Sequence, residues 1–238
     1  MIGSMEPILL IVYIALLMAA FLRMRGVTRE AMPQFNGTTI LFATAGALLI
    51  DRIVIAAGSV LGKGELLAAL NLGRLWLGVM IPPLLIVTYV EFTGRLKVKG
   101  AGTRTVATVV WGLAWAIFAL QVWSSLGSLE LDRLFAAGTG GLVYYLPQSP
   151  LTYPGTAAAN TIGVVFGIFI LLRTGWPLPL IGAGLVLAEA VFLPQSFIVA
   201  KGLEVLWIWT LVVTDWRAQK VGLQINRSEL DTRLDRLG

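Results

Sequence analysis

The stretch FIVAKGLEVLWIWTLVVTDW, residues 197–216, decides how the rest of the chain is interpreted. It is long and apolar enough to cross a bilayer, which takes about 20 residues in a helix. Lys201 and Glu204 nevertheless lie inside it. Charged side chains within a membrane-spanning helix are costly and usually face a partner or a watered cavity. The stretch therefore predicts a membrane helix that packs around a polar layer inside a bundle.

Composition indicates the same class of protein. Of the 238 residues, 57% are apolar and only 13% are charged, a balance that soluble domains do not have. The apolar runs are continuous and do not alternate, which favours helices over barrel strands. The chain contains no cysteine and no histidine, so we expect no disulfide, no metal and no cofactor. Its net charge of +5 comes from loops that orient membrane proteins, so we expect no nucleic-acid partner.

Seven apolar runs predict an all-α, polytopic integral membrane protein with seven transmembrane helices. The runs cover about 8–22, 38–61, 66–92, 106–126, 157–172, 178–193 and 197–216. We expect Pro82 and Pro83 to break the third helix near its middle, because neither can donate a backbone hydrogen bond. We interpret the first run as a helix of the mature protein and not as a removed signal peptide.

The charge pattern predicts two domains and an orientation. Residues 1–217 form the transmembrane domain, and residues 218–238 form an amphipathic cytoplasmic tail that lies on the membrane surface or docks a partner. Outside the runs, thirteen lysines and arginines follow the first, third and fifth helices or lie in the tail, against Lys63 and Arg133 on the opposite side. Because positive loops face the cytoplasm, the N-terminus is expected outside and the C-terminus inside the cell membrane.

Two helices share an internal similarity. The second contains AGALLIDRIV at residues 45–54, and the sixth contains AGLVLAEAVF at residues 183–192. Gly46 precedes Asp51 by five residues, as Gly184 precedes Glu189. This pattern predicts a parallel repeat of three helices, one connecting helix and three helices. The alternative is chance similarity between apolar segments.

Besides Glu91 and Asp215 at the cytoplasmic ends of their runs, six ionisable residues lie inside the apolar runs: Asp51, Arg52, Arg74, Glu189, Lys201 and Glu204. At about 1.5 Å per residue they all fall between the midplane and the predicted outer boundary. They form either ion pairs that fix helix register or a site that binds a ligand, moves a proton or lines a path. We expect the three carboxyls to be candidate catalytic residues. The candidate ligand-binding residues are Arg52, Asn71, Arg74 and Lys201.

Other polar, aromatic and small residues are expected to have simpler roles. We expect Glu91 and Asp215 to be solvated at the cytoplasmic ends of their helices. Gly163 and Gly167 form a GxxxG step, which predicts close helix packing. Three tryptophans of the last run are expected to contact lipid or the membrane interface: Trp207, Trp209 and Trp216.

Part of the chain resembles a known family. Asp51, GSVLG at 58–62 and LNLGRLWLGVMIPPLLIVTYVEF at 70–92 resemble a repeat unit of the heterodimer-type lycopene cyclases, including their fused forms. That unit has an acid in its second helix, then a proline and paired glutamates, two aromatics, a proline and a terminal Tyr-Glu. Asp51 matches the first acid, and Tyr89 with Glu91 matches the end. Arg74 and its neighbour Gly73 stand where the paired glutamates would be, which puts that part of the family's site in doubt.

The resemblance implies a small membrane enzyme of two tandem three-helix units that cyclises an apolar isoprenoid or carotenoid. In the second unit, GLEVLWIW at 202–209 supplies one glutamate followed by aromatics. The resemblance therefore implies Glu204 as proton donor, with Glu189 or Asp51 as acceptor, and an apolar ligand as partner. Arg74 and Lys201 oppose this role, because nearby cations favour ionised carboxylates.

Three other functions remain open. Seven helices with a broken third helix and a charged layer are also typical of a small-solute or ion transporter. A lysine in the seventh helix, Lys201, suggests an opsin-like receptor, although Phe197 stands four residues earlier where an acid is expected. A non-catalytic subunit of a larger membrane complex, or a homo-oligomer, would show most of the same features.

Overall fold

The computed structural model of the protein describes residues 6–30, 36–62, 64–96, 98, 103–126, 134–136, 142–144, 154–192 and 197–234. It confirms the all-α prediction. The helices are α1 (Glu6–Glu30), α2 (Gly37–Leu61), α3 (Glu65–Met80), the 3-10 helix η2 (Pro82–Leu84), α4 (Leu85–Arg95), α5 (Arg104–Leu126), α6 (Pro154–Thr174), α7 (Leu178–Phe192) and α8 (Phe197–Leu234). Because α3 and α4 are halves of one interrupted helix, the described residues form seven helices, as predicted.

The structure adds two short strands that the sequence does not predict. β1 (Leu134–Ala136) and β2 (Leu142–Tyr144) form an antiparallel pair in the connection between α5 and α6, with Leu134 opposite Tyr144. Each strand has three residues, so the pair is a local feature of this connection and leaves the helical class unchanged.

Two helices are longer than the sequence predicts. α1 continues through Arg23 and Arg25 to Glu30, and α8 continues from its apolar part to Leu234. Arginine, lysine, glutamate and glutamine are good helix formers, so charged residues extend a helix that is already nucleated. Most of the predicted tail is therefore a continuation of α8. Its side chains beyond Val221 lie outside the described residues, so its apolar leucine face stays a prediction.

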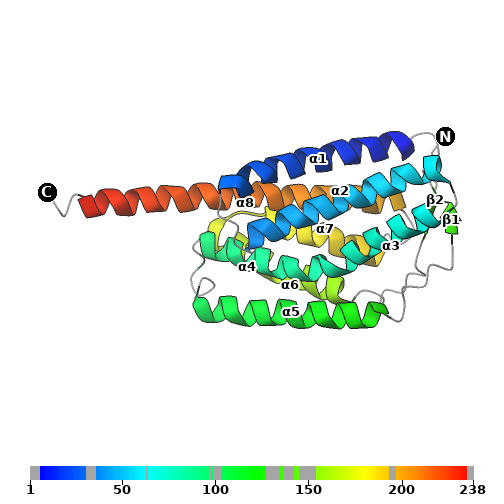
Figure 1. The fold of residues 1–238 in the computed structure, drawn as a ribbon. Helices are drawn as coiled ribbons and strands as arrows, with labels where there is room; N and C mark the ends of the chain where they lie inside the picture. Colours follow the sequence, from blue (N-terminus) through cyan, green and yellow to red (C-terminus); the bar gives the residue numbers. More distant parts are fainter. Residues whose placement is uncertain are drawn as a thin grey trace.

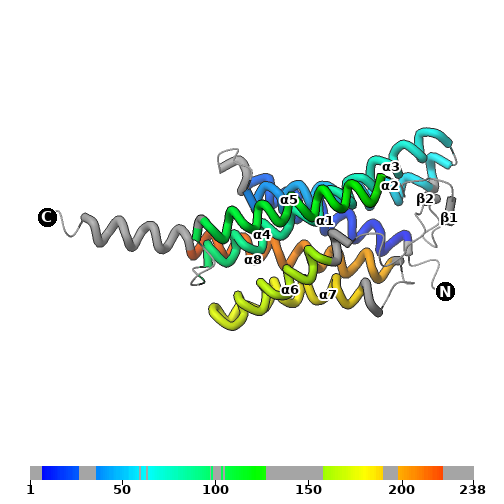
Figure 2. The backbone as a smooth tube through the Cα atoms, turned by 90° about the horizontal axis from the view of Figure 1, so that it is seen from below, coloured from blue at the N-terminus to red at the C-terminus, as the bar shows by residue number. Residues whose placement is uncertain are grey.

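The helices lie side by side along one common direction (Figure 1). α1 packs on α2, which also contacts α3 and α4, while α7 packs between α6 and α8. Figure 2 shows α6 and α7 on one side of the bundle, with α2 and α3 on the other. α8 joins the two groups, because it also contacts α1, α2 and α4.

The break between α3 and α4 follows from its two prolines, as predicted. Pro82 and Pro83 have no backbone N–H, so the carbonyls four residues earlier receive no helical hydrogen bond from them. The chain forms one turn of 3-10 helix, in which the Leu84 amide donates to the Ile81 carbonyl at 3.0 Å. The hydrogen-bond ladder is therefore interrupted between α3 and α4, which makes η2 a candidate hinge.

The outer surface of the bundle is apolar. Among the described residues, four helical segments are long and apolar enough to cross a membrane: Pro7–Gly26, Gly37–Gly58, Glu65–Arg95 and Thr105–Leu126. Two shorter apolar segments are Ala158–Thr174 and Leu178–Glu189. Large apolar side chains such as Val60, Trp123 and Leu172 are at least 75% exposed. Such a surface supports the predicted membrane class.

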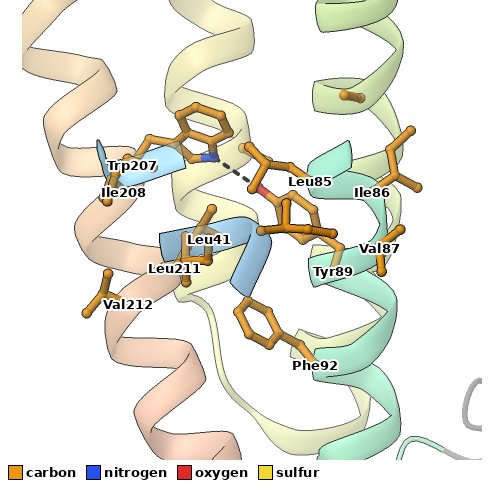
Figure 3. Packing of buried hydrophobic residues seen from close by; sticks show 14 of the residues in the cluster. Leu41, Leu85, Ile86, Val87, Tyr89, Phe92, Trp207, Ile208, Leu211 and Val212 are labelled. Carbon is orange, nitrogen blue, oxygen red and sulfur yellow. Dashed lines mark hydrogen bonds between the residues drawn. The ribbon is translucent and has the colours of Figure 1, made fainter. Parts of the chain in front are cut away.

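The central core joins α2, α4 and α8 (Figure 3). Leu41, Phe92 and Leu211 are almost completely buried there. Within this core the Trp207 indole N–H donates to the Tyr89 hydroxyl at 3.0 Å. The expectation that Trp207 faces lipid is wrong, because the residue is only 5% exposed. A buried indole N–H needs a hydrogen-bond acceptor, and Tyr89 supplies one from α4.

The GxxxG step of α6 mediates close packing, as predicted. A Cβ added at Gly163 would lie 2.8 Å from the Tyr89 ring, and one at Gly167 would lie 2.6 Å from the Leu180 Cα. Leu180 belongs to α7, and its backbone cannot rotate away as a side chain can. Gly167 therefore sets how closely α6 and α7 approach.

We expect Gly167→Ala to destabilise the protein by about 1–3 kcal/mol, the usual cost of overpacking. Gly112→Ala in α5 is the matched control, because a Cβ there meets no atom within 4 Å. Thermal unfolding in detergent, followed by tryptophan fluorescence, measures the difference. Equal melting temperatures for the two variants would contradict the close contact between α6 and α7.

Candidate functional site

Five charged side chains from three helices form one network, called here the Arg52 cluster. Its members are Asp51 and Arg52 of α2, Arg74 of α3, and Lys201 and Glu204 of α8. The Arg52 side chain has no exposed surface. Its guanidinium donates through Nη1 to Asp51 and through Nη2 to Glu204. Arg52 therefore ties α2 to α8.

Arg74 extends the cluster to α3. Its Nη1 donates to Asp51 Oδ1 at 2.6 Å, and its Nε donates to Asn71 Oδ1 at 2.7 Å. Asn71 is fully buried and donates its own amide to the Leu67 carbonyl at 2.8 Å. Residues three apart are neighbours on a helix surface, so Asn71 orients the Arg74 guanidinium toward Asp51.

Lys201 completes the cluster on α8. Its Nζ donates to Glu204 Oε1 at 2.9 Å and lies 3.9 Å from Asp51 Oδ2. Asp51 and Glu204 therefore each contact at least two cations, although their side chains are 14% and 17% exposed. Removing one member of a buried ion pair is costly, because it leaves the other charge uncompensated.

Glu189 of α7 lies beside the Arg52 cluster without joining it. It is within electrostatic range of Glu204, Lys201 and Arg52. Its Oε2 atom is buried and finds no hydrogen-bond partner in the described part of the chain. With three cations and two carboxylates, the cluster has a formal charge of +1 without Glu189. An ionised Glu189 would bring the sum to zero.

The structure thus brings together six of the seven predicted site residues, with Glu189 at the edge of the cluster. Asn71 contacts the cluster through Arg74. Which acid pairs with which base is decided by helix rotation, and Arg52 and Lys201 each contact both clustered acids. Catalysis by the carboxyls and ligand binding by the other residues stay predictions.

A second network, called the Arg95 cluster, joins the same α2 and α8 to α4. Its members are Thr38, Glu91, Arg95 and Asp215. Arg95 Nη1 donates to Asp215 Oδ1 at 3.0 Å and to Thr38 Oγ1 at 2.8 Å. Arg95 Nη2 donates to Glu91 Oε2 at 2.8 Å. Glu91 in turn accepts from the Gly37 amide, at the start of α2, at 2.8 Å.

The expectation that Asp215 is solvated is wrong, because its side chain is 1% exposed. Thr38, Arg95 and Gln219 all donate to its carboxylate, which compensates for its burial. Glu91 is less buried, at 27% exposure. The sequence signal for this cluster is the i, i+4 spacing of Glu91 and Arg95, typical of an ion pair on a helix. Nothing in the sequence indicates the contribution of Thr38.

The two clusters lie at opposite ends of an uncharged core. Asp51 follows Thr38 by thirteen positions, and Asp215 follows Glu204 by eleven. At about 1.5 Å per residue, the clusters are about 17–20 Å apart along the helix axes. α3 carries residues of the Arg52 cluster, α4 carries residues of the Arg95 cluster, and η2 lies between them. The intervening segments without a charged residue are 39–50, 75–90 and 205–214.

No family model, curated protein or solved structure matches the chain. The resemblance to lycopene cyclases therefore stays a prediction.

We expect Arg52→Met to destabilise the protein by about 3–5 kcal/mol, because Asp51 and Glu204 lose the cation that they share. Glu204→Gln should cost less, since a glutamine oxygen still accepts hydrogen bonds from Arg52 and Lys201. Arg173→Met, at an exposed arginine near the end of α6, is the matched control. Thermal unfolding in detergent measures all three. An Arg52→Met variant as stable as the control would show that Arg52 does not hold the cluster together.

Proposed function

We propose that the protein is a multi-pass protein of the cell membrane, with its N-terminus outside and its C-terminus in the cytoplasm. The four long apolar segments, the two shorter ones and residues 197–216 of α8 supply seven spans. The excess of lysine and arginine in the loops on one side supports the orientation. We further propose that α1–α4 and α6–α8 are parallel repeats joined by α5. In this arrangement the Arg52 cluster lies in the outer half of the membrane and the Arg95 cluster lies near the inner boundary.

We infer that the protein transports a small solute or ion and that the two clusters are its gates. The carrying observation is that two charged networks close the two ends of one core, and each joins α8 to α2 and to one half of a broken helix. Charges buried in membrane spans usually mark a path for a substrate or ion. Broken helices and the rocking of one helix group against another are typical of transporters.

The geometry supports opening at one end at a time. Opening the Arg52 cluster separates α8 from α2 and α3, while the Arg95 cluster still holds α8 to α4. Opening the Arg95 cluster separates α8 from α2 and α4, while the Arg52 cluster still holds α8 to α2 and α3 at the other end. The interrupted hydrogen-bond ladder at η2 allows α3 and α4 to move separately. A solute then contacts the core near Tyr89 and Trp207, whose polar atoms lie between the clusters.

A second candidate function is acid-catalysed chemistry on an apolar isoprenoid, as the resemblance implies. The uncharged core favours it, because a polyene cation must be protected from water. Glu189 is a better proton donor here than Glu204, which accepts from two cations and is held as a carboxylate. Organic extraction of the purified protein followed by mass spectrometry separates the two functions. A bound polyene or prenyl lipid supports the enzyme, and its absence favours the transporter.

The gates are tested by the accessibility of a cysteine placed between them. The chain has no cysteine, so Ile208→Cys introduces a single thiol at a completely buried position of the core. Glu204→Gln weakens the Arg52 cluster by about 1.5 kcal/mol, the lower end of the worth of a hydrogen bond to a charged group, because the glutamine oxygen still accepts from Arg52 and Lys201 but carries no charge. We expect roughly tenfold faster labelling from the outside by a membrane-impermeant maleimide. Asp215→Asn should accelerate labelling from the inside instead.

Glu65→Gln, at an exposed glutamate of α3, is the matched control and should leave both labelling rates unchanged. Sealed vesicles of both orientations give the two rates separately. If Glu204→Gln and Asp215→Asn both accelerate labelling from the same side, the two clusters are not gates. The same conclusion holds if both variants have a normal melting temperature and neither changes the labelling rate.

A further inference from the structure

One carboxyl group in the bundle has a buried oxygen that lacks the cation contacts of the neighbouring carboxylates. Glu189 Oε2 has no hydrogen-bond partner among the described residues, whereas Asp51 and Glu204 each contact at least two cations. An ionised oxygen without donors is strongly disfavoured in an apolar interior, and a protonated carboxyl is disfavoured much less. The observed arrangement of Glu189 therefore suits a carboxyl that carries a proton while the Arg52 cluster is intact.

The charged groups within electrostatic range of Glu189 come from two helices. Lys201 and Glu204 belong to α8, and Arg52 belongs to α2. α7 also packs on α6, whose residues 154–172 include no charged residue. A deprotonated Glu189 is thus a second acceptor for the same two cations that hold Glu204. Its carboxylate would also remove the formal charge of +1 from the cluster, which a low-dielectric interior favours.

We propose that Glu189 binds the coupling proton of the transporter and that this proton decides whether the Arg52 cluster is closed. The inference rests on the proposed transport function. With the proton bound, Arg52 and Lys201 stay with Glu204, and the outer end is closed. When the proton leaves, the Glu189 carboxylate pairs with Lys201 or Arg52, Glu204 loses a partner, and the outer end opens. The proton comes from water on one side and returns to water on the other, so no further reactant is required.

Infrared difference spectroscopy tests the proton site without reference to transport. We expect the protein in lipid to show the carbonyl band of a protonated carboxylic acid, which disappears as the pH is raised. Glu189→Gln should abolish this band, whereas Glu65→Gln should retain it. If Glu189→Gln does not fold, Glu189→Asp keeps the carboxyl and should shift the band without removing it. A band that persists in Glu189→Gln, or is absent from the unmodified protein, would overturn the proposal.

The coupling itself is tested by the pH dependence of cysteine labelling at Ile208→Cys. We expect labelling from the outside to accelerate roughly tenfold as the pH is raised, in line with the loss of one charged hydrogen-bond partner of Glu204. Glu189→Gln imitates the protonated state, so labelling should stay slow at every pH. Labelling in that variant that still accelerates with pH would contradict the coupling.

The two proposals fail in different ways. If Glu204→Gln and Asp215→Asn accelerate labelling from opposite sides but Glu189→Gln keeps the infrared band or the pH dependence, the gates stand and the proton site is wrong. If the band depends on Glu189 but neither cluster variant changes labelling, Glu189 binds a proton and the transport function is wrong.

Discussion

A charge buried in an apolar interior must find its counter-charge inside the protein, and the arrangement of this bundle depends on that requirement. Arg52 has no exposed surface and contacts both Asp51 and Glu204, so α2 and α8 have to meet at one rotation and one depth. Apolar side chains tolerate many alternative packings. A buried charge without a partner costs several kcal/mol, which is comparable with the whole stability of a domain. The Arg95 cluster imposes the same condition at the other end through Asp215. Between these fixed ends the core is free to be apolar.

Sequence patterns predict the features of this structure that depend on neighbouring residues, and not the ones that depend on distant parts of the chain. Apolar runs and prolines act locally, so the helices and the break at Pro82 were predictable. The number of residues from the end of a helix gives the depth of a side chain along the bundle. The sequence therefore also predicts that the ionisable residues share one layer. Pairing depends on helix rotation and on neighbours distant in sequence: Arg52 and Glu204 are 152 residues apart. The sequence predicts the wrong surroundings for Asp215 and Trp207, because a lone acid or indole in the last apolar run is equally typical of a membrane interface.

The ion pairs that stabilise the two ends of the bundle are also the ones that would have to break for either end to open. A few charge-assisted hydrogen bonds join α8 to its neighbours at each end, so one lost partner shifts the balance substantially. Glu189 lies within electrostatic range of Arg52 and Lys201, the two cations that hold Glu204. η2 separates α3, which carries Arg74 of the Arg52 cluster, from α4, which carries Glu91 and Arg95 of the Arg95 cluster. In the proposed transport cycle, the side chains that stabilise the bundle are therefore also the ones that open it.

Pairs of spin labels at both ends of the bundle can show whether the two ends open in alternation. Labels on cysteines at Leu61 and Val199 report the outer end, and labels at Thr105 and Lys220 report the inner end; all four positions are exposed. Pulsed electron resonance then gives the distance distribution of each pair in lipid. We expect two distances for each pair, and we expect Glu204→Gln to enrich the long outer distance together with the short inner one. A single distance in both pairs that Glu204→Gln does not change, or lengthening at both ends together, would contradict alternating gates.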